Sequence, residues 1–298
     1  MQLGATRIED TFAEAFAMSY ARLVVTACDA YWVEQAVGEA TGYASSVIGC
    51  DAEAGLEQRL GCDQTPDGRP GASILIFGFS AEALAAAVLN RVGQCIMTCP
   101  TTAAFDGLDQ AADRIPLGKH LRYFGDGYQK SKLLDARRYW RIPVMDGEFL
   151  VQEDCGAARG VGGGNIILQS VDEASGLAAG RRAVEAVAQC RGVIAPFPGG
   201  VVRSGSKVGS RYRRLRASTS EAYCPTLRGR VESRLAPEAN CAYEIVIDGT
   251  DEAAVSRAMG AAIRAAAGDG VVAIGAGNYG GKLGKYHFRL HELLQCQA

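Results

Sequence analysis

Two hydrophobic periodicities alternate along the chain, and one order of elements occurs twice. Alternating or continuous apolar runs predict strands, whereas apolar residues repeating every three or four positions predict helices. In the first half, strands are predicted at 21–27, 45–49, 72–79 and 94–99, with helices at 30–41 and 81–92. In the second half, strands are predicted at 165–170, 192–195, 242–248 and 271–276, with helices at 174–189 and 251–267. Both halves therefore have the order β-α-β-β-α-β.

This order is that of the split βαβ, or ferredoxin-like, unit. The predicted fold class is α+β, with two duplicated ferredoxin-like lobes whose helices pack on antiparallel sheets. Because each lobe is too small for a spacious pocket, the pattern favours a ligand site in a cleft between lobes or between subunits.

Local signals mark several element ends. Asp29, Ser80 and Thr250 precede three of the predicted helices, where short polar side chains cap the first turn. Alternating residues at 137–144 and 148–152 flank Asp146-Gly147, a combination typical of a hairpin with a type I′ turn. We therefore predict an N-terminal lobe at 1–150 that ends in this hairpin. A C-terminal lobe at 151–298 follows and includes a long loop at 196–241.

Composition excludes several classes of protein. The 298 residues carry 31 basic and 33 acidic side chains, a net charge of −2, which argues against a general nucleic-acid binder. Acids interrupt the first twenty residues, and no apolar run approaches the roughly 20 residues of a membrane span. These features favour a soluble cytoplasmic protein without a membrane association.

Metal ligation and disulfide formation are not expected either. The ten cysteines include no C-x-x-C pair, and the spacing of His287 and His291 falls in an alternating run that predicts a strand. We expect reduced, structural cysteines and no metal site.

Two short motifs have weak functional interpretations. Residues 275–280 match G-x-G-x-x-G, but a strand pattern follows them where a dinucleotide-binding motif requires a helix. A turn that closes the second repeat is the better interpretation. Cys224 before Pro225 is a conceivable nucleophile, but no base lies near it in the sequence.

The long loop at 196–241 carries the stronger candidates. Gly199 and Gly200 allow the backbone to approach a ligand closely, and Ser206, Lys207 and Ser210 add hydroxyls and a cation suited to carboxylates or phosphates. The alternative is a solvated basic loop. Glu244 lies in an apolar strand, where burial raises a carboxyl pKa towards the range useful for proton transfer. The alternative for Glu244 is a structural acid paired with an arginine.

Eight stretches in the same order carry a resemblance to one family. The chain resembles the formylmethanofuran:tetrahydromethanopterin formyltransferases along nearly its whole length. The matching stretches are residues 9–16, 65–71, 93–98, 124–128, 197–200, 205–210, 243–247 and 277–284.

The resemblance implies formyl transfer between the amine of methanofuran and N5 of tetrahydromethanopterin, by direct attack in a ternary complex. Both carriers would be co-substrates, with no metal or tightly bound prosthetic group. It also implies a homo-oligomer, a dimer or tetramer, and a complex with formylmethanofuran hydrolase subunits. Two alternatives stay open: a non-catalytic ligand-binding or structural subunit of such a complex, and a one-carbon enzyme that uses tetrahydrofolate.

The resemblance also implies roles for individual residues. Glu244 would stabilise the oxyanion or relay the proton. Because the carriers have polyanionic tails, arginines are expected to hold them. The residues expected to bind the carriers are Phe197, Gly199, Gly200, Arg203, Ser206, Lys207, Ser210, Arg69 and Gln94.

Overall fold

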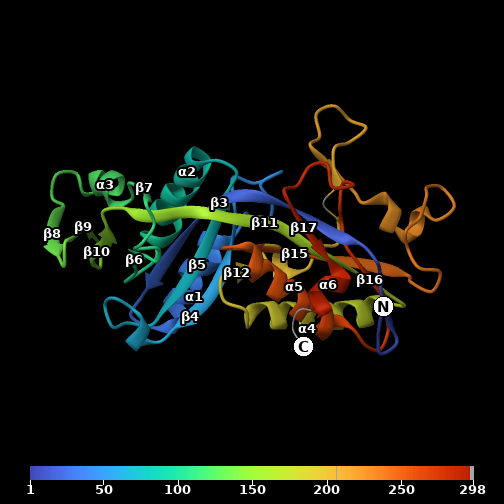
Figure 1. Cartoon of the computed structure of the whole chain (residues 1–298). Coiled ribbons are helices and arrows are strands. Elements are labelled where there is room, and N and C mark those ends of the chain that lie inside the picture. The colour runs from blue at the N-terminus through green and yellow to red at the C-terminus, as the bar shows by residue number, and fades with distance from the viewer. Residues whose placement is uncertain (206, 296–298) are drawn as a thin grey trace. The chain divides into compact units, whose positions relative to one another are not determined.

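The computed structural model describes residues 1–205 and 207–295 and divides into two compact units. The central unit comprises Met18–Gly160, and the terminal unit comprises Met1–Ala17 with Val161–Ala298. Two long strands, β3 (Phe12–Thr26) and β11 (Cys155–Ser170), contribute residues to both units (Figure 1). The class is α+β, as predicted: six α-helices accompany a mixed sheet in the described part of the chain.

The sheet of the central unit has the strand order β4-β5-β3-β6, in which all neighbours are antiparallel. Strand β10 then joins β6 in parallel, and β9 and β8 extend the sheet with antiparallel pairing. The short strand β7 (Asp113–Ile115) pairs with the start of β11. The bounds of the strands are β4 (Glu53–Leu60), β5 (Gly71–Gly78), β6 (Ala103–Asp106), β8 (Lys130–Leu134), β9 (Arg137–Val144) and β10 (Gly147–Gln152).

The core of the central unit lies where two helices cover one face of this sheet. Leu23 and Val25 of β3 and Ile74 and Ile76 of β5 alternate along their strands, so they point to one face and are fully buried there. Helices α1 (Ala30–Thr41) and α2 (Ala81–Arg91) bury their apolar stripes in the same cluster. A third, short helix is α3 (Gly118–Leu121).

The terminal unit repeats this strand order as β12-β15-β11-β16, again with antiparallel neighbours. Strand β2 (Thr6–Ile8) lies parallel to β16 and antiparallel to β1 (Gln2–Leu3), while β17 (Tyr286–Arg289) pairs with the first part of β3. Helices α4 (Glu173–Ala188) and α5 (Glu252–Ala266) lie next to each other in Figure 1 and share one buried cluster. The other bounds are β12 (Val193–Ile194), β15 (Cys241–Gly249), β16 (Val271–Gly275) and α6 (Leu290–Gln295).

Capping side chains fix the helix starts. Asp29 accepts from the amide of Trp32 and Ser80 from that of Ala83, as the sequence predicts. For α5 the cap is Asp251, which accepts from the amide of Ala254 at 2.8 Å, rather than the predicted Thr250.

Two predicted strands of the first repeat are wrong. Residues 45–49 form turns, and the strand is β4 instead. Strand β4 carries four polar residues, Glu53, Glu57, Gln58 and Arg59, which weaken its apolar signal. The second segment, 94–99, begins inside a π-helical turn (Val92–Ile96) that continues α2, and Val92 and Ile96 of this turn are fully buried. The strand that the sequence predicts here is β6 instead.

The hairpin β9–β10 is confirmed, but its turn is not of type I′. That type requires a positive φ at both central residues. Because Val144 pairs with Gly147, the central residues are Met145 and Asp146, and neither has a positive φ. The turn between β8 and β9 has positive φ values at both of its central residues, Asp135 (48°) and Ala136 (63°). The strand predicted to run through His291 is also shorter, because it ends at Arg289 and α6 begins at Leu290.

Three further expectations from the sequence concern membrane spans, the state of the cysteines and the lobe boundary. None of the helices within residues 1–205 and 207–295 is long and apolar enough to cross a bilayer. The nine cysteines in these ranges have free thiols. The expected lobe boundary at residue 150 stays a prediction.

Candidate functional site in the terminal unit

Glu244 lies in the middle of β15, opposite Ile167 of β11, and only 6% of the residue is exposed. On its other side it forms a single bridge with Val202: the amide of Val202 donates to the carbonyl of Glu244 at 2.7 Å, and the reverse bond is 2.9 Å. The strand therefore holds the start of the long 196–241 loop against this acid. The predicted burial of Glu244 is confirmed.

The loop opens with a tight turn at Pro198–Gly200. Gly199 and Gly200 have φ values of 61° and 74°, a region that glycine adopts without strain. A Cβ on Gly200 would lie 2.5 Å from Cγ2 of Val184 on α4, so close helix packing also requires glycine there. Phe197 is half-buried and Gly199 is exposed, which leaves Gly199 free to approach a ligand.

The polar residues of the loop differ in their surroundings. Lys207 begins β13 (Lys207–Val208), which pairs with β14 (Ala217–Ser218), and its ammonium forms a 2.5 Å ion pair with Glu221. Lys207 is thus already neutralised by a neighbour. Arg203 is exposed, and the hydroxyl of Ser210 accepts from the amide of Tyr212 at 3.0 Å. Ser206 lies outside the described residues.

Two tyrosines of the terminal unit whose pKa values the charge of Glu244 raises were not predicted. Burial raises the pKa of Tyr279, and the negative charges of Glu244 and Glu14 raise it further, against a lowering by the hydrogen bond from Val208. Burial also raises the pKa of Tyr223, with contributions from Glu9 and Glu244 that Arg234 opposes. Both phenols therefore keep their protons at neutral pH. The only sequence signal for Tyr279 is its place in the glycine-rich stretch 275–284.

Glu14 is a second carboxylate that the sequence analysis missed. It is 1% exposed on β3 and accepts hydrogen bonds from four backbone amides of the 279–284 segment. Burial raises the pKa of Glu14, but these four bonds outweigh burial and leave the pKa lowered. Glu14 is thus an anionic anchor of the glycine-rich stretch.

The other two predicted residues belong to the central unit. Arg69 uses its guanidinium within the fold: it donates to Asp67 at 2.8 Å, to the hydroxyl of Thr26 at 2.9 Å and to the carbonyl of Thr101. Gln94 is exposed at the rim of a pocket.

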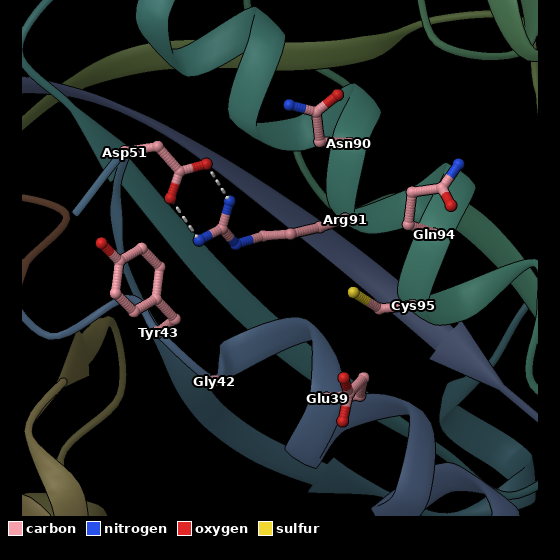
Figure 2. Close-up of a pocket in the computed structure, with 8 residues that line it drawn as sticks. All are labelled: Glu39, Gly42, Tyr43, Asp51, Asn90, Arg91, Gln94 and Cys95. Atoms are coloured by element: carbon pink, nitrogen blue, oxygen red, sulfur yellow. Dashed lines mark hydrogen bonds and ion pairs between the residues drawn. The ribbon is translucent and has the colours of Figure 1, made fainter.

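That pocket of the central unit has a volume of about 510 Å³ (Figure 2). At its edge, the guanidinium of Arg91 makes two bonds of 2.7 and 2.9 Å to Asp51, and Tyr43, Glu39 and Cys95 face the same space. Burial raises the pKa of the Cys95 thiol, which keeps it protonated and poorly nucleophilic. Across residues 1–205 and 207–295, no three His, Cys, Asp or Glu side chains cluster as a metal site would require.

The fold and the site together define an α+β protein with a buried carboxylate, two protonated phenols and a glycine-rich loop. Comparison with known proteins gives the family. Residues 1–144 match the model of the formylmethanofuran-tetrahydromethanopterin formyltransferase family, and residues 147–293 match that of its proximal lobe. The chain belongs to this family.

Individual relatives cover the chain nearly end to end. A formylmethanofuran--tetrahydromethanopterin formyltransferase of Methylobacillus flagellatus is 50% identical, over 99% of this chain and 100% of the relative. A component of the formyltransferase/hydrolase complex of Methylorubrum extorquens is also 50% identical, over 99% of this chain and 98% of the relative.

Two solved structures share the fold. The crystal structure of the Methylorubrum extorquens formyltransferase/hydrolase complex with methylofuran contains a chain with a TM-score of 0.95 and 50% identity, covering 99% of this chain and 98% of that one. The formylmethanofuran:tetrahydromethanopterin formyltransferase of Methanosarcina barkeri has a TM-score of 0.93 at 44% identity, covering 98% of this chain and all of that one.

Proposed function

We propose that this protein transfers a formyl group between the amine of methanofuran and N5 of tetrahydromethanopterin. The observation that carries the proposal is the 50% identity, over 99% of the chain, to a relative named for this activity. A match of this extent includes the strand of Glu244, the 196–241 loop and the glycine-rich stretch.

The chemistry requires no nucleophile from the protein. The amine of one carrier attacks the formyl carbon of the other, a C–N bond forms, and the carbonyl oxygen becomes an oxyanion. The attacking nitrogen loses a proton, and collapse of this intermediate breaks the second C–N bond and releases the other amine, which takes up a proton. Binding both carriers together makes the attack effectively intramolecular.

In this scheme Glu244 stabilises the oxyanion in its protonated form or relays the proton. Its burial in β15 supports the assignment, because hydrogen bonds to a developing charge are stronger where water is largely excluded.

The loop residues would position the carriers. Gly199 and Gly200 present backbone, and Phe197 an apolar surface. Arg203, Ser206, Lys207 and Ser210 would meet the anionic tails, and Lys207 must then exchange its Glu221 partner for the ligand. Arg69 and Gln94 complete the proposed set, although the Arg69 donors are already engaged within the fold.

The finer structural expectations belong to the same proposal. The common strand order of the two units supports a duplicated ferredoxin-like arrangement, with lobes at 1–150 and 151–298. The relative that is a component of a formyltransferase/hydrolase complex supports hydrolase subunits as partners. We further propose a cytoplasmic homo-oligomer that uses methanofuran and tetrahydromethanopterin as carriers and no metal.

The test is a formyl-exchange assay with the purified chain, formyl-tetrahydromethanopterin and methanofuran. We expect exchange with the wild type and, because general acid-base catalysis contributes about 10²-fold or more, a comparable fall in kcat with modest change in KM for Glu244→Gln. The exposed Glu185→Gln, on α4, is the control for loss of a carboxylate and should retain full activity.

Three outcomes would contradict the proposal in different ways. No exchange by the wild type would favour a structural role in the hydrolase complex. Faster exchange with formyl-tetrahydrofolate would identify the other pterin. Full activity of Glu244→Gln would remove this residue from the mechanism.

A further inference from the structure

The carboxylate of Glu14 has an unusual number of backbone partners. One oxygen, Oε2, accepts from the amides of Tyr279 at 2.8 Å and Gly281 at 2.9 Å. The other, Oε1, accepts from the amides of Leu283 at 2.5 Å and Gly284. Four N–H groups pointing at one buried anion form a cradle that a neutral side chain cannot satisfy equally.

The segment between β16 and β17 is shaped to fit this anion. Gly280 and Gly281 have φ values of 72° and 73°, which direct successive amides inward. A Cβ on Gly284 would lie 2.5 Å from the carbonyl oxygen of Ala15 and 2.6 Å from Cγ of Glu14. The segment and Glu14 therefore fit only in close contact, and Glu14 sets where the segment runs.

The same segment carries Tyr279 towards the candidate site. The Tyr279 hydroxyl oxygen accepts from the amide of Val208 at 3.3 Å, so it contacts the strand that begins with Lys207. Its ring lies 6.5 Å from that of Phe16, at a tilt of 53°. Strand β15 meets the same loop from the other side, because Glu244 and Val202 exchange two backbone hydrogen bonds.

From these contacts we propose that Glu14 is a positioning residue for formyl transfer: it fixes the 279–284 segment so that the Tyr279 hydroxyl is held against the Lys207–Val208 strand of the candidate site. The inference rests on the proposed function. Glu14 is buried under the segment and acts through Tyr279, whose hydroxyl it holds at the 196–241 loop.

The decisive experiment is a double-mutant cycle. Glu14→Gln keeps the side-chain shape but turns an NH₂ group towards amide donors, so the segment must shift. Because a displacement of about 1 Å can cost about 10²-fold in rate, we expect a fall in kcat of that order, with KM changing less than about threefold. If Glu14 acts through Tyr279, the same substitution in a Tyr279→Phe background should lower kcat less than about threefold further.

Two more variants separate positioning from folding. Gly284→Ala leaves the Glu14 charge in place but displaces the segment, and it should reproduce both the kcat loss and its dependence on Tyr279. Glu14→Asp retains the anion and should recover part of the activity. Glu292→Gln, a carboxylate that is 68% exposed on α6, is the control and should behave as the wild type.

The outcomes distinguish this inference from the proposed function. Equal losses from Glu14→Gln in both backgrounds would overturn the positioning role, because a general folding defect lowers the active fraction regardless of Tyr279. An NMR resonance of isotope-labelled tyrosine, assigned to Tyr279 by its absence from Tyr279→Phe, gives a readout that needs no activity. It should move in Glu14→Gln and Gly284→Ala. An unmoved resonance would overturn the inference even in an inactive protein, whereas a moved resonance without any wild-type exchange would contradict the proposed function alone.

Discussion

Replacing Asp51 with asparagine should destabilise the central unit, because Asp51 neutralises a buried guanidinium. The Arg91 side chain is only 7% exposed, whereas that of Asp51 is 47% exposed, and two bonds of 2.7 and 2.9 Å join them. Breaking a fully buried pair costs about 3–5 kcal/mol and an exposed pair about 0–1 kcal/mol, so we expect about 2 kcal/mol for this half-exposed acid.

Urea unfolding monitored by tryptophan fluorescence measures this cost. Both tryptophans, Trp32 and Trp140, lie in the central unit, so their emission reports on its unfolding. With a slope of about 2 kcal/mol per molar urea, Asp51→Asn should lower the midpoint by about 1 M.

The pH dependence has a definite sign. The hydrogen bonds from Arg91 hold the pKa of Asp51 below its usual range, and attraction to its charge adds to this, while burial opposes it. The stabilisation is therefore complete above the unfolded-state pKa of about 3.9, and it is lost as pH falls through the lowered folded-state pKa. Asp51→Asn removes it at neutral pH, so the difference between variant and wild type should shrink in acid.

A chemically similar pair on the surface provides the control. Arg59 and Glu34 are also joined by two bonds, but their side chains are 69% and 43% exposed. We expect Glu34→Gln to change the unfolding free energy by less than about 1 kcal/mol. If the two variants had equal effects, or if Asp51→Asn matched the wild type at neutral pH, burial of Arg91 would not be what gives this pair its strength.

Three further outcomes are expected. Gly200→Ala should lower stability by about 1–3 kcal/mol, because its φ is 74° and the new Cβ would meet Val184; a thermal melt checks this. In the folded protein the exposed Cys62 should react with a maleimide while Cys155 should not, since burial strongly raises the pKa of that thiol, and mass spectrometry after proteolysis locates the label. Ile247→Ala should cost about 2–5 kcal/mol in urea unfolding, because the residue is fully buried in the core of the terminal unit.

Much of the secondary structure follows from local sequence. The α1 and α2 helices begin directly after Asp29 and Ser80, because these side chains accept hydrogen bonds from amides three residues further on. This interaction requires no distant partner. The β9–β10 hairpin is similar, since its strands are adjacent in sequence. Burial of Glu244 was also predictable, because its neighbours in β15 are apolar.

Tertiary structure decided what local patterns could not. The sequence of β4 is too polar for its apolar pattern to predict a strand, and it forms a strand because it pairs with β5. The 94–99 run has a strand-like composition, but the buried stripe of α2 extends into it as a π-helical turn. In both segments, packing against residues distant in the sequence overrides the intrinsic secondary-structure propensity of the residues.

The sequence by itself determined the α+β class, most of the helices and the burial of Glu244, because each depends on residues a few positions apart. Only the folded chain placed Glu14 against Leu283, 269 residues away, and paired Lys207 with Glu221. Such contacts depend on strand order and backbone path, and no periodicity in the sequence encodes them. The physical reason is that hydrophobic alternation specifies which face is buried, whereas the partners across that face are set by how the strands assemble.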